Sequence, residues 1–416
     1  MKIKQLALSL ACLFLAQISI AQTKISAPAS SRIGPAFVGQ DGIVRGYNMT
    51  LKQARQLTLK AAKDLNSFYC IDRGKQGYFE LDSTDTTSPD DNSTVVVLFG
   101  SKRFRYTSQE GIYNVCRFGA IPNDGKDDSE AFRKGINFLK PGEVLFVGTG
   151  VYEIQKPLDI SKHNFHLKGA NLSQINFSPT TAQNGFVFSG FDIQIENIRF
   201  VSNEKVLTSV TLKGNGSRCS VRNCVFEGHS SRPTTQKGLV IDGSTPATYL
   251  TTVSDTKFMY FDVAFDLFGE TNGNFYNLNF HHPRIGIRIA TLGMLSSFSK
   301  MFFQTYQDYA IQCVKGGYSF SDLHFESNTG PGLRFENGSN FSYYANILQT
   351  GSQLAISDAG ADNFGFGHNG PFALKYRLKP TYDIYVEPNC LFLDMGYANV
   401  LSFKKADGSI FRFWTP

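Results

Sequence analysis

The sequence predicts an all-β protein, a right-handed parallel β-helix built from stacked coils. The composition is typical of strands and turns, with 38 Gly, 37 Phe and 18 Tyr but a single Trp in 416 residues. Apolar segments recur at a period of about two dozen residues, which indicates a solenoid. Two such series interleave with the same spacing, so we interpret them as two faces of one coiling chain.

The first series places Asn or Asp three residues before Phe. Stacked coils would put each phenylalanine on the next and each Asn or Asp in a column at a bend, where these residues tolerate unusual dihedral angles. Phe177 and Phe302 or Phe303 fill the same series, and the register slips by one residue near Met301 to Gln304. The clearest members are Asn197 to Phe200, Asn223 to Phe226, Asp255 to Phe258, Asn277 to Phe280 and Asp322 to Phe325.

The second series lies between the members of the first, and its side chains are expected to alternate between the two sides of a strand. A β-propeller would have a period nearer to about 40 residues, and a leucine-rich repeat would have regular Leu and Asn spacing. We therefore expect the β-helix over residues 111 to 370, in about ten turns. The members are Leu239 to Asp242, Val263 to Asp266, Ile287 to Ala290, Ile311 to Val314 and Leu333 to Glu336.

Residues 22 to 110 are expected to form a small N-terminal α/β module. Apolar residues at roughly helical spacing predict a helix within Met49 to Ser67. Residues 371 to 416 are expected to form C-terminal capping strands that cover the open edge of the last coil. The same strands could instead form a subunit contact, and a homotrimer is compatible with that alternative. Strand-like runs there are Tyr382 to Val386, Cys390 to Leu393, Val400 to Phe403 and Ile410 to Trp414.

A second helix is expected at Ser129 to Leu139, capped by Asp128 or Ser129. Asp124, Asp127 and Asp128 precede this helix, and a carboxylate site is one interpretation of the cluster. Their position at a turn and a helix start favours capping and sealing of the solenoid end.

Residues 1 to 21 resemble a secretory signal peptide. Lys2 and Lys4 precede an apolar run from Leu6 to Ile20, which ends with small residues at the cleavage positions. The run is shorter than the roughly 20 residues of a membrane span, so membrane insertion is not expected. A lipoprotein modified at Cys12 fits the pattern less well. We expect a secreted protein, whether extracellular, periplasmic or on the cell surface.

The net charge and the spacing of the cysteines limit the kinds of partner and metal site that we expect. The net charge of +6 includes Lys2 and Lys4, and no dense Lys/Arg run predicts a nucleic-acid surface. The weak basic bias suits an acidic glycan, and solubility alone explains it equally well. No cysteine has metal-ligand spacing, so no structural metal site is expected. Cys219 and Cys224 could form a disulfide, although buried free thiols are the interpretation we favour.

The segment from Val115 to Phe132 carries Phe-Gly-Ala, Asp-Gly and Asp-Asp-Ser before a helix. It resembles the opening motif of the pectate-lyase-like β-helix superfamily, which includes polygalacturonase-like, rhamnogalacturonase-like and epimerase-like enzymes and phage tailspike-like proteins. Gly142 to Val147 and Gly150 to Ile154 resemble its first coil. The stretch Gly77 to Asp82, with Arg103 to Arg105, resembles the short module before tailspike helices. The resemblance implies a polysaccharide partner.

The chain departs from the polygalacturonase pattern, because Asn-Thr-Asp, Gly-His-Gly and Arg-Ile-Lys do not occur in the expected order. The nearest segment is Gly365 to His368. The family's catalytic residues are therefore not carried over. A glycoside hydrolase or polysaccharide lyase acting on an acidic glycan is expected, and a non-catalytic, glycan-binding or adhesive tailspike-like protein is the alternative.

Asp242 and Asp266 are the predicted catalytic residues. Strand alternation turns both outward, and a shift by one coil would place them about 4.8 Å apart. Such a pair raises one carboxyl pKa and supplies the acid of a glycosidase. Arg288 and Arg334 in the neighbouring outward column, with Glu336 further along, would bind a uronate. In a lyase the same residues would hold Ca²⁺, and no other cofactor is expected. Alternatively, these residues merely solvate the face.

A second outward set follows the phenylalanine series: Glu227, Met259, His281, Gln304 and Glu326, with Tyr260 and His282 beside them. His281, Glu326 and Tyr260 are predicted to bind substrate, because histidine beside carboxylates and a tyrosine suits a sugar site. Such a set also suits a lyase in which His or Tyr exchanges the proton. The alternative is that His281 and His282 form only a surface turn.

Overall fold

The computed structural model describes two compact parts of the chain, one mainly within residues 44–105 and one mainly from residue 106 onward. The described residues are 36–38, 44–57, 65–108, 110–214, 217–244, 248–290, 296–326, 332–335, 339–350, 354–358, 364–368, 372–375, 401–404 and 410–413. Residues 1 to 21, Glu336, Cys390 and the runs Tyr382 to Val386 and Cys390 to Leu393 lie outside them.

The first part holds a six-stranded sheet in the order β1-β2-β3-β4-β6-β5 and one short helix. Helix α2 (Leu51–Gln56) begins with a reciprocal capping box, in which Thr50 and Gln53 bond to each other's backbone N–H. It lies in the segment where a helix was predicted. The strands are β1 (Ala36–Val38), β2 (Val44–Met49), β3 (Ser67–Cys70), β4 (Gly77–Leu81), β5 (Val95–Leu98) and β6 (Lys102–Thr107).

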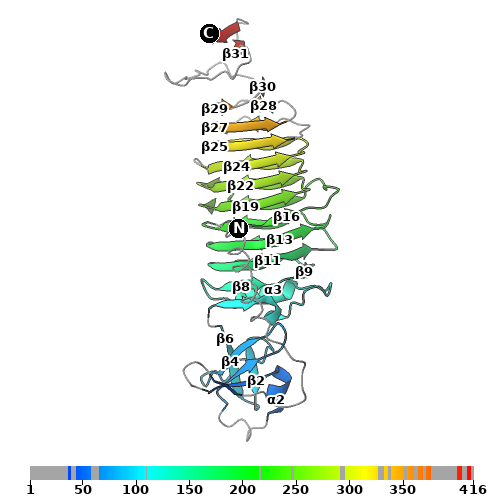
Figure 1. Ribbon diagram of the computed structural model, residues 1–416, viewed down its shortest axis with the longest axis vertical. Helices are drawn as coiled ribbons and strands as arrows, with labels where there is room; N and C mark the ends of the chain where they lie inside the picture. Colours follow the sequence, from blue (N-terminus) through cyan, green and yellow to red (C-terminus); the bar gives the residue numbers. More distant parts are fainter. Residues whose placement is uncertain are drawn as a thin grey trace, which may run out of the picture. The chain divides into compact units, whose positions relative to one another are not determined.

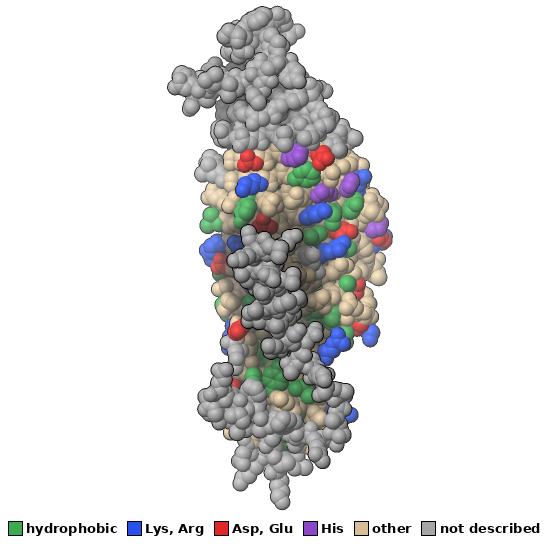
Figure 2. Space-filling view, in the orientation of Figure 1, with side chains coloured by type: hydrophobic (Ala, Val, Ile, Leu, Met, Phe, Trp, Pro, Cys, Tyr) green, Lys and Arg blue, Asp and Glu red, His purple; other side chains and the backbone are tan. Residues whose placement is uncertain are grey.

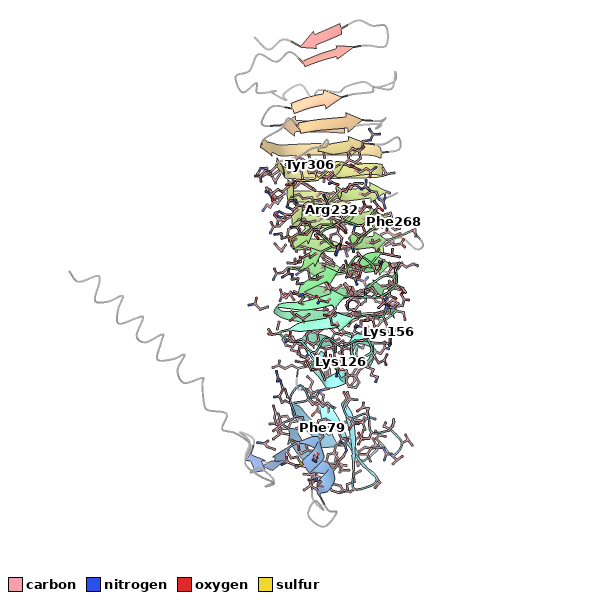
Figure 3. All side chains as sticks on the ribbon, turned by 90° about the vertical axis from the view of Figure 1, so that its right-hand side faces the viewer. Phe79, Lys126, Lys156, Arg232, Phe268 and Tyr306 are labelled. Carbon is pink, nitrogen blue, oxygen red and sulfur yellow. The ribbon has the colours of Figure 1, made fainter. Side chains whose placement is uncertain are left out.

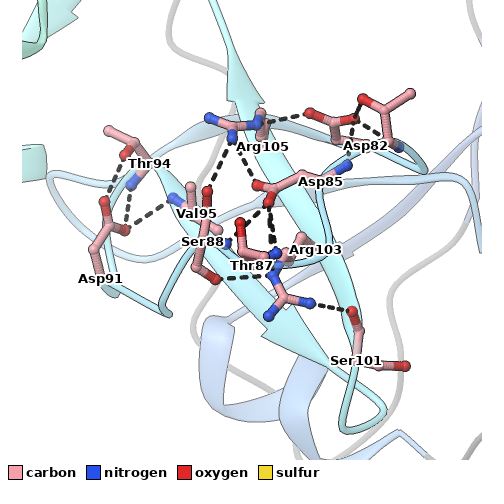
Figure 4. A network of polar contacts seen from close by, with 11 residues as sticks. Asp82, Asp85, Thr87, Ser88, Asp91, Thr94, Val95, Ser101, Arg103 and Arg105 are labelled. Atoms are coloured by element: carbon pink, nitrogen blue, oxygen red, sulfur yellow. Dashed lines mark hydrogen bonds and ion pairs between the residues drawn. The ribbon is translucent and has the colours of Figure 1, made fainter.

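The acidic loop after β4 is held by arginines of β6 (Figure 4). Arg105 donates to Asp82 at 2.8 Å and to Asp85 at 2.6 Å. Arg103 donates to the Ser88 carbonyl oxygen at 2.8 Å. The backbone N–H of Ser88 lowers the pKa of Asp85 to about 2. These carboxylates therefore fix the loop in its fold.

The second part is a right-handed parallel β-helix of about 11 turns, which confirms the predicted fold class (Figure 1). Each coil pairs in parallel with the coils before and after it, along a bent strand and a second, separate strand. The 3-10 helix η1 (Val115–Phe118) and helix α3 (Ser129–Phe138) lie at its beginning, and α3 confirms the second predicted helix.

The bent strands occupy one run of the solenoid: β7 (Ile112–Asn114), β8 (Val144–Val147), β9 (Val151–Ile154), β11 (Phe165–Phe177), β13 (Ile193–Ser202), β15 (Ser220–Arg222), β16 (Val225–Glu227), β19 (Thr252–Met259), β22 (Asn274–His281), β24 (Ser296–Gln304), β25 (Tyr309–Glu326), β27 (Ser339–Thr350) and β29 (Phe364–His368). In β11, β13, β19, β22 and β24, and across the β15–β16 pair, the two halves meet at a bend. The first half of β25 belongs instead to the second run of strands, which is described next.

The second run consists of β10 (Leu158–Ile160), β12 (Phe186–Phe188), β14 (Thr208–Lys213), β17 (Lys237–Asp242), β20 (Val263–Phe268), β23 (Ile285–Ala290), β26 (Leu333–Phe335), β28 (Leu354–Asp358) and β30 (Phe372–Lys375). Outside these runs, β18 (Thr248–Tyr249) pairs with β21 (Glu270–Thr271). Strands β31 (Leu401–Lys404) and β32 (Ile410–Phe413) form an antiparallel pair that overlaps two of the predicted C-terminal runs.

Phenylalanines stack along the core, as predicted. Successive ring centroids lie between 4.7 and 5.9 Å apart. Phe280 pairs in register with Phe303, so the predicted slip of register is wrong and Phe302 faces outward. The doublet was ambiguous because Lys300 stands at the bend where other coils have Asn or Asp. The stacked rings belong to Phe177, Phe200, Phe226, Phe258, Phe280, Phe303 and Phe325.

The predicted Asn/Asp column lies at the bend, where these residues adopt positive φ angles between 49° and 61°. Neighbouring side chains bond along the column, because Asn223 donates to Asn197 at 2.6 Å and Asn277 donates to Asp255 at 2.7 Å. These polar bonds and the phenylalanine stack both repeat at each coil. Together they hold the register of the bent strands.

Gly286 makes room for the phenylalanine stack. A Cβ atom there would lie 2.5 Å from the Ala310 carbonyl oxygen and 2.8 Å from the Phe303 ring. We expect Gly286→Ala to lower the free energy of unfolding by about 1–3 kcal/mol, because the added methyl group overpacks the core. Denaturant unfolding measures this. Ser299→Ala, on the outward side of β24, is the control, and an equal loss in both variants would contradict the explanation.

The five described cysteines Cys70, Cys116, Cys219, Cys224 and Cys313 form no disulfide. Cys219 and Cys224 are both buried, as the favoured interpretation predicted. Among the described helices, none is long and apolar enough to cross a membrane.

Candidate functional site

The predicted stacking of Asp242 on Asp266 is wrong. Asp266 pairs in register with Val240, and Asp242 pairs with Phe268, so the two carboxylates occupy different columns. The observed register of β17 and β20 differs by two residues from the alignment that would place Asp242 opposite Asp266. The reason is that Phe265 and Leu267 fill the core positions of β20. A stacked carboxylate pair at these two residues does not form.

Arg288 and Arg334 lie in the same column as Asp266, whereas they were expected in the neighbouring column. Arg288 pairs with Asp266 in register, and the column continues through Gln312 to Arg334. Asp242, in the neighbouring column, accepts hydrogen bonds from the hydroxyl and N–H of Ser244. Its carboxylate closes a turn.

Asp266 is fully buried, although it was expected to face solvent. Its carboxylate lies 2.6 Å from Lys237 Nζ, and Arg288 donates to both of its oxygens, at 2.9 and 2.5 Å. The hydrogen bond to Asp266 raises the pKa of Arg288. A buried carboxylate with two cationic partners is typical of a structural ion cluster.

The second predicted set does form a continuous surface. Met259, His281, Gln304 and Glu326 pair coil by coil, with Glu227 preceding them. A parallel outward column lies two residues earlier on each strand, and Tyr260 and His282 lie at the adjoining turn. In Figure 2, histidine, hydrophobic and basic side chains gather at one edge of the upper described coils. We define the histidine strip as Lys257, Met259, Tyr260, Asn279, His281, His282, Phe302, Gln304, His324 and Glu326.

His281 has the properties of a neutral base at the centre of the histidine strip. Its Nδ1 lies 2.8 Å from Gln304 Oε1, and with this oxygen as acceptor Nδ1 carries the proton. The other ring nitrogen, Nε2, then keeps its lone pair. Burial lowers the pKa of His281, and the nearby Lys257 and His282 lower it further. The imidazole is therefore unprotonated at neutral pH.

One aromatic ring lies beside His281, and a stacked pair of rings lies at the adjoining turn. The Phe302 ring centroid lies 5.7 Å from that of His281 and 4.9 Å from that of His324. Tyr260 and His282 stack with nearly parallel planes, with centroids 5.3 Å apart. Both adopt positive φ angles at the turn, 62° and 54°. Flat apolar rings beside polar groups are typical lining residues of a ligand site.

Four residues of the histidine strip were not predicted from the sequence. Lys257, Asn279 and His324 each stand two residues before an outward residue that was predicted. Strand alternation was therefore the signal that could have identified them. Phe302 was missed because the adjacent Phe303 matches the core series equally well.

The carboxylates before α3 connect the first coils, as the sealing interpretation predicted. Asp128 accepts from the N–H groups of Ile121 at 3.0 Å and Glu153 at 3.2 Å. Asp127 accepts from the N–H groups of Ser129 and Gln155. Asp128 is the N-cap residue, but its side chain makes no capping bond. Burial raises the pKa of Asp128 to about 6.

Asp128→Asn is expected to destabilise the fold by about 1–3 kcal/mol, because the amide nitrogen that replaces one carboxylate oxygen cannot accept the N–H group bonded to that oxygen. The raised pKa means that the native state binds more protons than the unfolded state between about pH 4 and pH 6. Wild-type stability from this group therefore increases as the pH falls through that window. Thermal melts should show a larger loss in the variant at pH 4 than at pH 7, and the reverse order would contradict this assignment.

Among the residues that the structure describes, no group of three or more His, Cys, Asp or Glu side chains is arranged to hold a metal ion. Arg334 is half-buried, and its guanidinium lies 6.0 Å from the Tyr309 ring centroid.

No protein family and no curated protein matches the sequence. Solved structures do resemble it. Tailspike protein 2 of Escherichia coli O157:H7 bacteriophage CAB120 is 11% identical, with 76% of this chain and 52% of that chain covered and a TM-score of 0.49. The tailspike protein gp49 of Acinetobacter baumannii bacteriophage Fri1, a capsular polysaccharide depolymerase, is 12% identical, with 79% and 75% covered and a TM-score of 0.46.

The tailspike protein of Acinetobacter phage vB_ApiP_P1 is 11% identical, with 81% of this chain and 76% of that chain covered and a TM-score of 0.44. The chain spans about half the length of the bacteriophage CAB120 protein. At these identities the likeness is one of fold.

Proposed function

We propose that the protein binds and cleaves an acidic polysaccharide along the histidine strip, with His281 as the base. The observation that carries this proposal is the His281–Gln304 hydrogen bond, which leaves Nε2 as the basic nitrogen of a ring near Lys257 and Phe302. A base, a cation and apolar rings are the groups that a uronate chain needs, since it presents a weakly acidic C–H next to a carboxylate.

The reaction we propose is β-elimination. His281 Nε2 takes the proton from the carbon next to the uronate carboxylate, and the electron pair of that bond forms a carbon–carbon double bond. The bond between the adjacent β-carbon and the glycosidic oxygen breaks, and the leaving oxygen takes up a proton from water. Lys257 would stabilise the negative charge that develops on the carboxylate. Tyr260 would pack against the sugar ring, and Glu326 would accept hydrogen bonds from its hydroxyl groups.

Hydrolysis is favoured less by the described residues of the histidine strip. A glycosidase needs two carboxyl groups about 5 to 9.5 Å apart across the bond. Glu326 is the one carboxylate of the strip, and Glu227, further down the same column, pairs with Arg199. Asp266 is held in its ion cluster on the other run of strands. The strip thus offers a histidine base in place of a carboxylate pair.

We further propose that the protein is secreted, since its polymeric partner would be met outside the cell. Because Lys257 supplies a positive charge within the histidine strip, we expect cleavage to continue in the presence of a chelator. Loss of activity on chelation would instead assign the neutralising role to Ca²⁺.

The experiment that tests the function is a screen of the mature protein against acidic and neutral polysaccharides. Reducing ends and ultraviolet absorbance are followed together. We expect both to increase on a uronate polymer, because elimination leaves an unsaturated uronate at each new end. Reducing ends without absorbance would indicate hydrolysis. Binding without either product would favour the adhesive, non-catalytic alternative.

A further inference from the structure

A nine-residue loop borders the histidine strip at the turn of Tyr260 and His282. It runs from Gly228 to Gln236, between β16 and β17, whereas the equivalent turns of the next two coils span only residues 260–262 and 282–284. Buried Gln236 fastens its base by accepting from His229 N–H and donating to the Asn203 and Val206 carbonyl oxygens. The N–H of Thr235 donates to Asp262 at 3.1 Å.

Arg232 extends from this loop to later coils. Its Nη1 donates to the carbonyl oxygen of His282 at 3.2 Å, fifty residues further along the chain. With the Gln307 amide oriented to accept, its oxygen lies 3.1 Å from Nη1 and 2.7 Å from Nη2. Figure 3 labels Arg232 between Phe268 and Tyr306 along the solenoid. The guanidinium is therefore held against the backbone of the turn that carries the His282 ring.

Arg232 differs from two other arginines of the solenoid, Arg284 and Arg218, in the partners of its charge. Arg284 forms ion pairs with Asp262 and Asp308, and Arg218 forms one with Asp192. Among the described residues, no carboxylate lies within 4.0 Å of the Arg232 guanidinium. Neutral oxygens orient it and leave its positive charge uncompensated by a close ion pair. An oriented guanidinium with remaining N–H donors is suited to bind an anion.

We infer that Arg232 is a specificity-determining residue that binds the acid group of a sugar lying on the Tyr260–His282 ring pair. This inference rests on the proposed function of the histidine strip and adds its anion receptor. The acid group is a uronate carboxylate or a sulfate ester, both of which accept paired hydrogen bonds from guanidinium. Arg232 also fixes the loop against the backbone of His282, so the receptor and the ring pair are positioned together.

The test is calorimetric binding of three oligosaccharides of equal length to the full mature chain: an oligogalacturonide, a sulfated galactan oligosaccharide and a neutral cello-oligosaccharide. We expect Arg232→Gln to weaken the anionic ligand that wild type prefers by at least about tenfold, the effect of losing one charge-assisted hydrogen bond. Any binding of the neutral ligand should be unchanged. The preferred anion identifies the acid group. Wild type that binds neither anion would overturn the inference.

Arg218→Gln is the matched control, because Arg218 also lies near an aromatic ring, 5.5 Å from Phe191, but donates to both oxygens of Asp192 at 2.7 Å. It should leave binding unchanged. Arg232→Lys keeps the charge and should recover part of the affinity. Equal weakening in both Gln variants, or an Arg232→Gln loss that includes the neutral ligand, would overturn the assignment.

The binding test is independent of cleavage. His281→Gln should keep its affinity for the anionic ligand and lose only turnover. If no variant and no wild-type sample cleaves any polymer while Arg232→Gln still weakens anion binding, the receptor stands and the catalytic proposal fails. Limited proteolysis of the loop at residues 228–236 tests whether weaker binding comes from a loosened loop or from the lost charge. If the lost charge is the cause, Arg232→Lys and Arg232→Gln should be cut at similar rates.

Discussion

Asp266→Ala is expected to lower the free energy of unfolding by about 3–5 kcal/mol, because the positive charges of Lys237 and Arg288 lose the buried carboxylate that compensates them. The carboxylate is fully buried and contacts both cations within 3 Å. The neighbouring described residues of its column, Val240, Arg288, Gln312 and Arg334, offer no other carboxylate to replace it. The loss should be measured by denaturant unfolding at neutral pH, with unchanged slope against denaturant concentration as the sign that the transition is comparable.

Asp242→Ala is the matched control for this change. Asp242 is partly exposed, and its bonds to Ser244 close only a surface turn. A loss of about 1 kcal/mol or less is expected there. If Asp266→Ala instead folds with wild-type stability and loses activity, Asp266 has the catalytic role that the sequence predicted.

His281→Gln is expected to reduce kcat/KM on the cleaved polysaccharide by about 10²- to 10⁴-fold, the usual contribution of a positioned general base. Glutamine preserves much of the side-chain volume but cannot take up the proton. His163→Gln, at the turn before β11, should leave the rate unchanged. A loss of the same size in both variants would indicate a general effect of histidine replacement.

The pH dependence provides a second readout of the same group. Burial lowers the pKa of His281 from its ordinary value of about 6.5, so the unprotonated, active form persists below that pH. The wild-type rate should decrease only as the pH falls through this lowered pKa. The residual activity of His281→Gln should not show this acidic limb. A wild-type limb above pH 6.5 would contradict an unprotonated His281 as the base.

The solenoid and its core were predictable because they arise from short, repeated patterns. Each coil presents Phe three residues after a bend residue, and stacking converts this spacing into the continuous column that contains Phe226 and Phe258. The bend also follows from local chemistry, since Asn and Asp tolerate positive φ. The outward positions next to each core phenylalanine could be predicted from the same spacing, and His281 was predicted on that basis.

The Asp242–Asp266 pair failed because register across coils depends on the lengths of the turns and on the core residues of each strand. Matching the two aspartates ignored Phe265, whose side chain fills the core position opposite Leu239. Burial of Asp266 depends on Lys237 and Arg288, which belong to the two neighbouring coils. The contact between Arg232 and His282 spans fifty residues, so no local pattern indicates it.

The most direct test of the histidine strip compares the initial cleavage rates of wild type, His281→Gln and Asp242→Asn on one acidic polysaccharide, followed by ultraviolet absorbance. We expect cleavage by wild type, its loss in His281→Gln and a rate near wild type in Asp242→Asn. A fully active His281→Gln beside an inactive but folded Asp242→Asn would rule out His281 as the base and return the active site to the face that carries Asp242.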